Sequence, residues 1–516
     1  MLLKLRTGCE AASVCKLLSM RPLAKIPFVG LLICGCALGQ AAPASAPKSP
    51  MALRLDTVHR AAEQTDPMPE LEQLCDEIGP RLTGSVAAQA AERQVLEYMR
   101  KVGLQQVHAE GWTLPRGWQR GPATASLVTP FRIPIPIAAY GWTGSTPAHS
   151  GPVQVVLLHA NDVEEHLNSL VESQGANWRG KALVIGSDPD KPMRAYSELL
   201  PLLRAATAAH AVVVIRHDTR PGNGIVHTEP VAVALPETID TNLIPAVDLP
   251  VEHQRLIEGL LLQNRPVNID INVENSFSAG PVRSKNIVGE IEGAVHPEEV
   301  VLVGAHLDSW DLGTGATDDG FGAAAVLGAA QALVRAGLRP ARTLRFVLFT
   351  GEEEGLLGSR AYVRQHAAEL GKIVAAFALD WGAGPIVKLP TAGHSELVPL
   401  LTDFNELTPE LHLEPPDDGW LFMTDAYAFT LAGLPGIAPL VRAPGYLEQA
   451  HSAEDTLDKV SPADLRQAMT VLAMAGFFLA DAHDIPQGHF TPAQTASALI
   501  RGKQKPMLEV FGLWPF

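Results

Sequence analysis

Residues 300–308 read VVLVGAHLD, and residues 342–354 read RTLRFVLFTGEEE. Each stretch begins as a short apolar run, typical of a buried strand, and ends in ionisable side chains. Residues 373–380, IVAAFALD, follow the same plan. Helical segments are predicted between the strands, at residues 321–336 and 355–370. Strands that alternate with helices predict an α/β fold, with a mostly parallel, doubly wound sheet and helices on both faces.

Ionisable side chains follow these strands at the point where each one ends, or lie in the loops that leave them. The carboxyl ends of parallel strands share one edge of an open α/β sheet, and ligands bind at that edge. The gaps between successive candidates are too long for a local calcium-binding loop. They fit a site at one edge of the sheet, to which each strand–helix–strand connection contributes one ligand. The candidates are His306, Asp318, Glu352, Glu353, Asp380 and His451.

The residue types at this edge indicate a metal centre. Carboxylates forced together repel one another, and burying them unpaired is costly unless a positive charge gathers them. Imidazole and carboxylate ligands without thiolate suit zinc, with manganese or cobalt as substitutes. Two histidines and three carboxylates can hold two ions if one carboxylate bridges them, and such a pair can activate a water and polarise a carbonyl. A glutamate beside a ligand is well placed to be the general base.

The residues alone leave two roles open. Glu352 with Glu353, or Glu353 with Glu354, can form the pair of base and ligand. Asp318 and Asp319 compete for the bridging position. Both choices need information beyond the spacing.

Several segments resemble the co-catalytic zinc exopeptidases, a family of aminopeptidases and related enzymes. Residues 306–320 read HLDSWDLGTGATDDG, and residues 352–359 read EEEGLLGS. The similarity extends to residues 79–85, GPRLTGS, and to residues 337–344 and 424–425. It covers nearly the whole chain after the N-terminal segment, up to about residue 485, and the combined motifs are highly specific.

This resemblance implies a role for each candidate. Glu352 would be the base, Glu353 a ligand and Asp318 the bridging carboxylate. Asp308 would orient the ring of its neighbour in the ligand shell. Tyr446 is a candidate donor to the developing oxyanion, because Ala450 stands before the last ligand where some relatives carry an aromatic residue or histidine. The ligands that complete the two shells would be His306, Asp380 and His451.

The pattern of residue types along the sequence changes near residue 131. Short β-branched runs such as residues 153–158 and 211–215 alternate with loops rich in Gly, Pro and Asp, which favours a β-rich module. Residues 177–185, NWRGKALVI, resemble a protease-associated domain, an insert that the resemblance links to site access or to homodimer contacts. The predicted parts are a leader (1–46), a peptidase domain in two pieces (47–130 and 277–485), a protease-associated-like insert (131–276) and a C-terminal tail (486–516).

The first 46 residues are predicted to be a leader for export. Arg21 and Lys25 precede an apolar run at residues 26–38, and small residues follow. This order is typical of a signal peptide, and the run is too short for a comfortable membrane span. Of five cysteines only Cys75 lies beyond the leader, so no internal disulfide is predicted after its removal. This pattern favours a periplasmic or extracellular protein, with lipid attachment at Cys36 as the alternative.

Composition limits the classes of partner. The 516 residues are 47% hydrophobic and 19% charged, with a net charge of −16, which argues against nucleic acid or an anionic membrane. We therefore predict an exported, two-zinc exopeptidase that hydrolyses dipeptides or short peptides with a free terminus. A single-zinc glutaminyl cyclase-like acyltransferase and a non-catalytic binding protein on the same fold are the alternatives.

Overall fold

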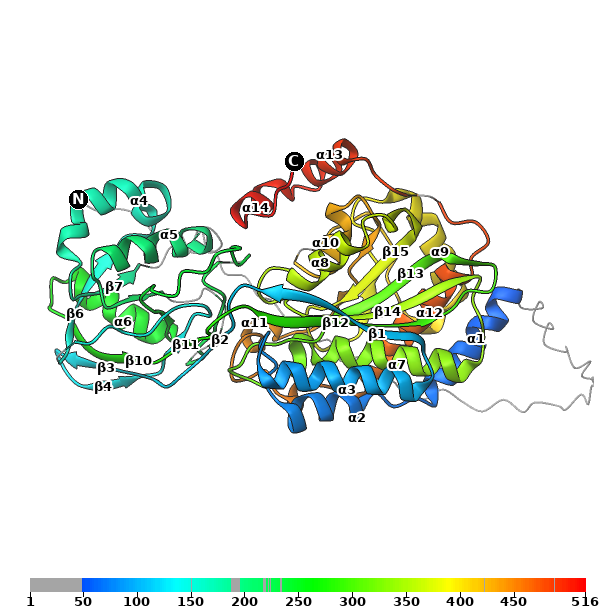
Figure 1. Cartoon of the computed structure of the whole chain (residues 1–516), viewed down its shortest axis with the longest axis horizontal. Coiled ribbons are helices and arrows are strands. Elements are labelled where there is room, and N and C mark those ends of the chain that lie inside the picture. Colours follow the sequence, from blue (N-terminus) through cyan, green and yellow to red (C-terminus); the bar gives the residue numbers. More distant parts are fainter. Residues whose placement is uncertain are drawn as a thin grey trace, which may run out of the picture. The chain divides into compact units, whose positions relative to one another are not determined.

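The computed structural model describes residues 49–149, 151–186, 195–216, 220, 222, 224–232, 234–421, 423–486 and 488–516. The predicted leader, with Cys36, lies outside the described residues. Two larger sheets, one of six strands and one of eight, organise the described chain (Figure 1).

The six-stranded sheet has the strand order β1-β12-β14-β13-β15-β17. Its pairings from β14 through β13 and β15 to β17 are parallel, whereas β12 runs antiparallel to both β1 and β14. The sheet is therefore mixed, and its parallel half carries the strands that end in the predicted site. The strands are β1 (Gln105–Leu114), β12 (Val282–Ile291), β13 (His296–His306), β14 (Arg342–Phe349), β15 (Ile373–Leu379) and β17 (Gly436–Ile437).

Helices cover both faces of this sheet, because successive side chains of a strand point to opposite faces. On one face Val301 and Val303 of β13 share a core with α1 (Pro50–Glu63), α3 (Val86–Val102), α7 (Phe321–Ala336) and α12 (Pro462–Asp481). On the other face Val300 and Leu302 share a core with α8 (Leu357–Gln365) and α10 (Ala426–Leu431). Figure 1 shows α3 and α7 on one side of the strands and α8 and α10 on the other.

Local sequence signals explain several element boundaries. Ser85 begins α3, since its side chain accepts a hydrogen bond from the N–H of Ala88. Cys75 is buried, and burial raises the pKa of its thiol to about 11, which makes it an inert core residue. β17 and β18 (Leu440–Val441) are separate strands, and β18 joins a separate two-stranded sheet with β16 (Ile386–Lys388). Pro439 lies between them and has no N–H to continue the ladder.

The eight-stranded sheet lies in residues 123–273, called the eight-stranded region below. Its order is β4-β3-β10-β6-β7-β8-β9-β5, and its centre, from β6 to β9, is parallel. The strands are β3 (Ala123–Thr129), β4 (Ile133–Ile135), β5 (Ala138–Ala139), β6 (Val153–Leu158), β7 (Ala182–Ile185), β8 (Val213–Ile215), β9 (Ala246–Asp248) and β10 (Asn268–Val273).

Helices accompany the strands of this region, for which the sequence predicts a β-rich module. These helices are α4 (Ala160–Gln174), α5 (Ala195–Ala208) and α6 (Val251–Leu262), which the parallel strands need as crossovers. Because β3 belongs to the sheet, the predicted start at residue 131 falls inside it. The assignment as a protease-associated-like insert stays a prediction.

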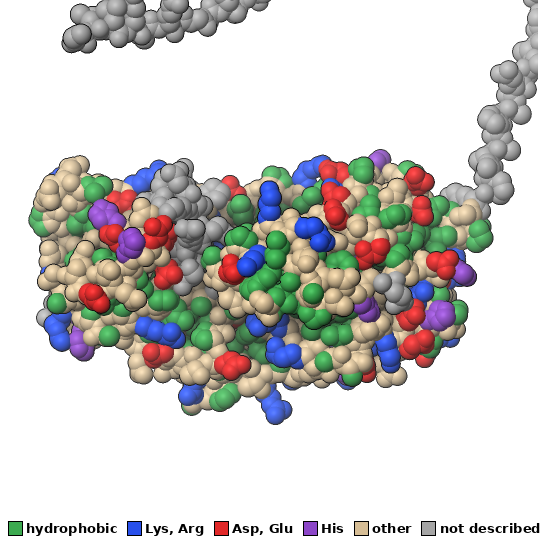
Figure 2. Space-filling model, turned by 90° about the horizontal axis from the view of Figure 1, so that it is seen from above, with side chains coloured by type: hydrophobic (Ala, Val, Ile, Leu, Met, Phe, Trp, Pro, Cys, Tyr) green, Lys and Arg blue, Asp and Glu red, His purple; other side chains and the backbone are tan. Residues whose placement is uncertain are grey.

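The C-terminal tail forms two helices that the sequence analysis did not anticipate. They are α13 (Pro492–Arg501) and α14 (Lys505–Val510), and their apolar side chains pack against Leu356 and Tyr427. Within the described ranges, no helix has the length and apolarity that crossing a membrane requires. On the face shown in Figure 2, acidic and basic side chains are interspersed with apolar ones.

Candidate active site

Strand register brings the predicted residues to one edge of the six-stranded sheet. In the parallel pairing of β13 with β14, His306 lies opposite Phe349, the last residue before the loop that carries the glutamates. In the pairing of β13 with β15, Ala305 lies opposite Leu379, directly before Asp380. Because these strands end in register, His306, Glu352 and Asp380 meet at their carboxyl ends.

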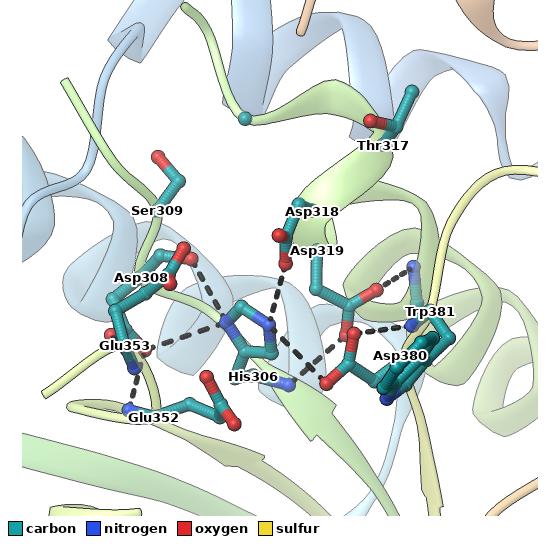
Figure 3. Close-up of polar contacts among 12 residues, drawn as sticks. His306, Asp308, Ser309, Thr317, Asp318, Asp319, Glu352, Glu353, Asp380 and Trp381 are labelled. Carbon is teal, nitrogen blue, oxygen red and sulfur yellow. Dashed lines mark hydrogen bonds and ion pairs between the residues drawn. The ribbon is translucent and has the colours of Figure 1, made fainter. Parts of the chain in front are cut away.

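The first ligand group consists of His306, Asp318 and Asp380. Nε2 of His306 lies 3.2 Å from Oδ1 of Asp318 and 4.0 Å from Oδ2 of Asp380. Figure 3 shows these two carboxylates at the Nε2 end of the His306 ring. All three side chains are buried, and their ligand atoms lie within 4.8 Å of one another.

The second ligand group consists of Asp318, Glu353 and His451. Nε2 of His451 lies 3.1 Å from Oδ2 of Asp318 and 3.1 Å from Oε2 of Glu353. Its ligand atoms also lie within 4.8 Å of one another. Asp318 therefore belongs to both groups, with one oxygen toward each histidine, which is the orientation of a bridging carboxylate.

A third set of possible ligands lies at the opposite end of β13. Its members, His296, Glu298 and Glu299, are largely exposed. Exposed acidic groups commonly occur without an ion, so the buried pair of groups is the better candidate.

Burial gives the carboxyl groups of the two ligand groups unusual pKa values. Burial, together with the charge of Asp318, raises the pKa of Glu353 and of Asp380 to about 7. Burial alone would also raise the pKa of Asp318, but hydrogen bonds from His306 and His451 hold it below its usual range. Oε1 of Glu353 has no hydrogen-bond partner among the described residues. Closely spaced carboxylates, one of which has an oxygen without a hydrogen-bond partner, are suited to hold a cation. The residues present therefore fit divalent metal ions.

Asp308 organises the loop between the two strand ends. Its carbonyl oxygen lies 3.1 Å from Nδ1 of His306, and its carboxylate oxygen Oδ1 lies 3.7 Å from the same nitrogen. The carboxylate also accepts hydrogen bonds from the N–H groups of Glu352 and Glu353, both at 3.4 Å. Burial alone would lower the pKa of His306, but hydrogen bonds to Asp308 and Asp318 raise it well above its usual value. Asp308 is thus placed to orient the His306 ring and the loop that carries the glutamates.

The geometry separates the alternatives that spacing left open. Asp319 uses both carboxylate oxygens on backbone N–H groups, those of His306 at 3.2 Å and Gly322 at 2.8 Å, and it belongs to neither ligand group. Glu354 is buried but also belongs to neither group. These placements favour Asp318 as the bridge and Glu353 as the ligand.

Glu352 is the remaining acidic side chain beside the ligands. Burial raises its pKa well above the usual value, and the charges of Asp380 and Glu353 add to the rise. A raised pKa suits a group that first takes a proton and then returns it. The role of Glu352 as the base, implied by the family resemblance, stays a prediction.

A pocket of about 310 Å³ lies beside the site. Trp381, which follows Asp380, and Tyr446 form part of its wall, together with Leu421, Val441 and Ala443. The hydroxyl of Tyr446 donates a hydrogen bond of 2.9 Å to Oδ2 of Asp318, so this wall touches the metal ligands. The apolar lining fits an apolar side chain.

Sequence reasoning missed several residues around the site. Asp425 is buried, and burial raises its pKa to about 7; residues 424–425 were part of the family resemblance, but no role was assigned. Asp455 accepts hydrogen bonds from the N–H and hydroxyl of Thr317. Glu229 and Arg220 come from the eight-stranded region and contact His451. No local motif marks these two, because only the folded arrangement brings them to the site.

The comparisons with known proteins agree with this geometry. Residues 286–475 match the model of peptidase family M28. The chain is 28% identical to carboxypeptidase Q of Mus musculus over 414 residues, 79% of this chain and 84% of that protein. Carboxypeptidase Q of Homo sapiens is also 28% identical, over 422 residues, with 80% and 84% covered.

Solved structures give the same result. The M28 peptidase precursor of Shewanella amazonensis superimposes with a TM-score of 0.72 at 27% identity and covers 84% of this chain and 99% of its own. BSAP, a zinc aminopeptidase of Bacillus subtilis, has a TM-score of 0.59 at 20% identity, covers 85% and 98%, and shows the shared fold.

Fold, site and comparisons together define a metallo-exopeptidase, an enzyme that acts on peptides. Residues 286–475, which carry most of this site, are similar to peptidase family M28.

Proposed function

We propose that this protein is an exported, two-zinc exopeptidase that hydrolyses dipeptides or short peptides. The observation that carries the proposal is the orientation of Asp318, which directs Oδ1 toward His306 and Oδ2 toward His451. The imidazole and carboxylate donors suit zinc in both ligand groups. The first group would hold one ion and the second group the other, with Asp318 shared. When bound, such ions supply Lewis acidity and positive charge that favour attack of water on a carbonyl.

Glu352 performs the proton transfers in this proposal. Its carboxylate accepts a proton from the attacking water while the new C–O bond forms at the peptide carbonyl. The C–N bond then breaks, and Glu352 delivers the same proton to the leaving amine. The buried position of Glu352 keeps this proton from exchanging freely with solvent. Asp308 keeps the loop of Glu352 in place through the backbone contact described above.

We further propose that the apolar pocket beside Tyr446 and Trp381 holds a side chain of the substrate. The pocket adjoins Asp318, so a side chain in it would place the neighbouring peptide bond near the ligands. The chain's similarity to carboxypeptidase Q and the structural likeness to an aminopeptidase support a substrate with a free terminus.

The test of this function is Glu352→Gln in the zinc-loaded protein. The expected result is a loss of kcat of at least ~10²-fold, the usual contribution of a general base, with both ions retained. Glu354→Gln is the matched control: it replaces a buried neighbouring glutamate outside both ligand groups, and its activity should stay within about tenfold of wild type. Activity of Glu352→Gln near the wild-type level would remove the base assignment.

Metal analysis tests the two-metal part of the proposal. Active enzyme should contain two zinc ions per chain, whereas one ion or none would remove the two-metal mechanism. A substrate with N-terminal glutamine should be hydrolysed rather than cyclised, because cyclisation without hydrolysis would indicate the acyltransferase alternative.

Export is proposed from the leader-like residues 1–46. The expected result is a shortened mature chain outside the cytoplasm, and N-terminal sequencing of the mature protein would locate the cleavage site. A mature protein that still begins at Met1 would contradict export through a cleaved signal.

A further inference from the structure

A segment of the eight-stranded region runs along the loop that carries His451. The N–H of Thr228 donates a hydrogen bond of 2.9 Å to the carbonyl of His451, and His227 forms an antiparallel bridge with Ser452. Nε2 of His227 also lies 3.2 Å from the carbonyl oxygen of Glu448. The backbone of this ligand loop is therefore held by residues that are distant in the sequence and belong to the eight-stranded region.

The same segment also contacts the imidazole of His451. Nδ1 lies 2.9 Å from Oε1 of Glu229 and 3.2 Å from the carbonyl oxygen of Thr228, while Nε2 faces Asp318 and Glu353. The ring of Trp310 lies 5.9 Å away between centroids and limits rotation of the imidazole. Both edges of the ring are thus occupied, one by the eight-stranded region and the other by the second ligand group.

The chemistry of imidazole makes this contact selective. For Nε2 to bind a cation it must present a lone pair, so Nδ1 must carry the hydrogen. An ionised carboxylate only accepts hydrogen bonds, so Glu229 favours the tautomer with hydrogen on Nδ1. The carbonyl of Thr228 acts in the same direction but carries no charge, and a charged acceptor is the stronger one.

Arg220 completes the arrangement around Glu229. Its guanidinium forms an ion pair with Glu229, and Nη1 donates a hydrogen bond of 2.9 Å to the carbonyl of Ala450. Nη2 lies 3.0 Å from Nδ1 of His451, but an arginine cannot accept the hydrogen on Nδ1. Arg220 therefore acts on Glu229, whose carboxylate it holds beside His451 through the ion pair.

We propose that Glu229 is a positioning residue for His451, through which the eight-stranded region determines how tightly the second ligand group holds its ion. This inference rests on the proposed two-metal function. It gives the region a role in the metal centre itself, in addition to any role in substrate access. The first ligand group has no contact with Glu229 among the interactions of the described residues, so its ion should be insensitive to a change there.

The experiment measures zinc affinity at both groups in the full chain by competition with a chelator, for wild type, Glu229→Gln and Glu237→Gln. Glutamine keeps the size of Glu229 but removes its charge. In Glu229→Gln the affinity that His451→Ala also weakens should fall by ~10–100-fold, as is usual for residues that orient a metal ligand, and the other should stay unchanged. Glu237→Gln is the matched control, since Glu237 belongs to the same region but is exposed, and both of its affinities should equal those of wild type.

Two further measurements separate positioning from general destabilisation. The visible spectrum of the cobalt-loaded protein should change in Glu229→Gln and resemble that of His451→Ala, while the circular dichroism spectrum should match wild type. Wild-type affinity at both groups in Glu229→Gln would overturn the inference, and so would equal weakening of both ions. A wild-type protein that binds fewer than two ions would instead overturn the proposed function, and this inference with it.

Discussion

The hydroxyl of Thr83 donates a hydrogen bond of 2.9 Å to the carboxylate of Asp308, although 225 positions separate the two residues along the chain. Both side chains are buried. Arg81, in the same N-terminal segment, donates hydrogen bonds of 2.8 Å to the carbonyls of Leu307 and Gly315. Residues 79–85 therefore support the loop after β13 through these hydrogen bonds. This support explains why a segment without any ligand shares the family resemblance.

Asp308→Asn should weaken the site without removing a ligand. An amide offers one acceptor oxygen where the carboxylate offers two, so one of its donors, Thr83 or a backbone N–H of the glutamate loop, loses its partner. We expect metal affinity or kcat/KM to fall by ~10–100-fold. Thr83→Val is the control for the lost hydrogen bond alone, and it should cost less, about tenfold, because the two backbone donors remain. Equal kcat/KM in Asp308→Asn and wild type would contradict this role.

Much of the fold could be predicted from the sequence because local signals and tertiary packing agree there. β14, β15 and α7 begin and end where their apolar patterns do. The side chains at the strand ends could also be grouped in advance, because parallel register places the ends of neighbouring strands together. His306 and Asp380 needed no information beyond this rule to be brought to one edge.

Other features depend on contacts that no local pattern records. The helices of the eight-stranded region escaped prediction although α4 and α6 have ordinary lengths of 15 and 12 residues, because the β-branched runs on either side of them dominate the local pattern. Glu229 lies in a segment without regular structure, and its contact with His451 spans 222 positions. A contact between residues so far apart in the sequence follows from the packing of the loops of the two sheets.

Metal uptake should depend steeply on pH. In the metal-free chain burial raises the pKa of Glu353 and of Asp380 to about 7, so protons occupy these ligands below that pH and compete with the ion. Burial alone would lower the pKa of His451, but the charge of Glu353 and the hydrogen bond to Asp318 raise it to about 9, so this imidazolium must also lose a proton. Binding should therefore release protons and strengthen as pH rises from 6 to 9.

Chelator competition at pH 6, 7 and 8, corrected for the protonation of the chelator, measures this dependence. Proton release in weak buffer at pH 7 provides an independent check. Equal affinity at pH 6 and pH 8 would show that the ligands are already deprotonated in the metal-free chain.

Tyr446→Phe should lower kcat while leaving metal content unchanged. Burial and the charges of Asp318 and Asp380 raise the pKa of the Tyr446 hydroxyl well above its usual value, so it remains a donor at neutral pH. As the oxyanion donor that the sequence predicts, Tyr446 should contribute ~10²–10³-fold to kcat, and its loss should leave KM nearly constant. Tyr427→Phe is the matched control, because this buried tyrosine bonds Gln504 instead of a ligand. A similar kcat loss in both variants would assign the effect to packing.

Ala443→Leu should change which peptides are cleaved. Ala443 lines the pocket of about 310 Å³ between Trp381 and Tyr446, and a larger side chain would occupy the space proposed for the substrate. Each methylene that no longer fits costs about 1–3 kcal/mol, so kcat/KM for dipeptides with large apolar residues should fall at least ~10-fold. Dipeptides of glycine and alanine should be cleaved at the wild-type rate. A dipeptide series varied at both positions measures the effect and shows which residue enters the pocket. Ala367→Leu, at an exposed position, is the control. A uniform loss for all dipeptides would indicate damage to the site and would contradict a role of the pocket in selecting side chains.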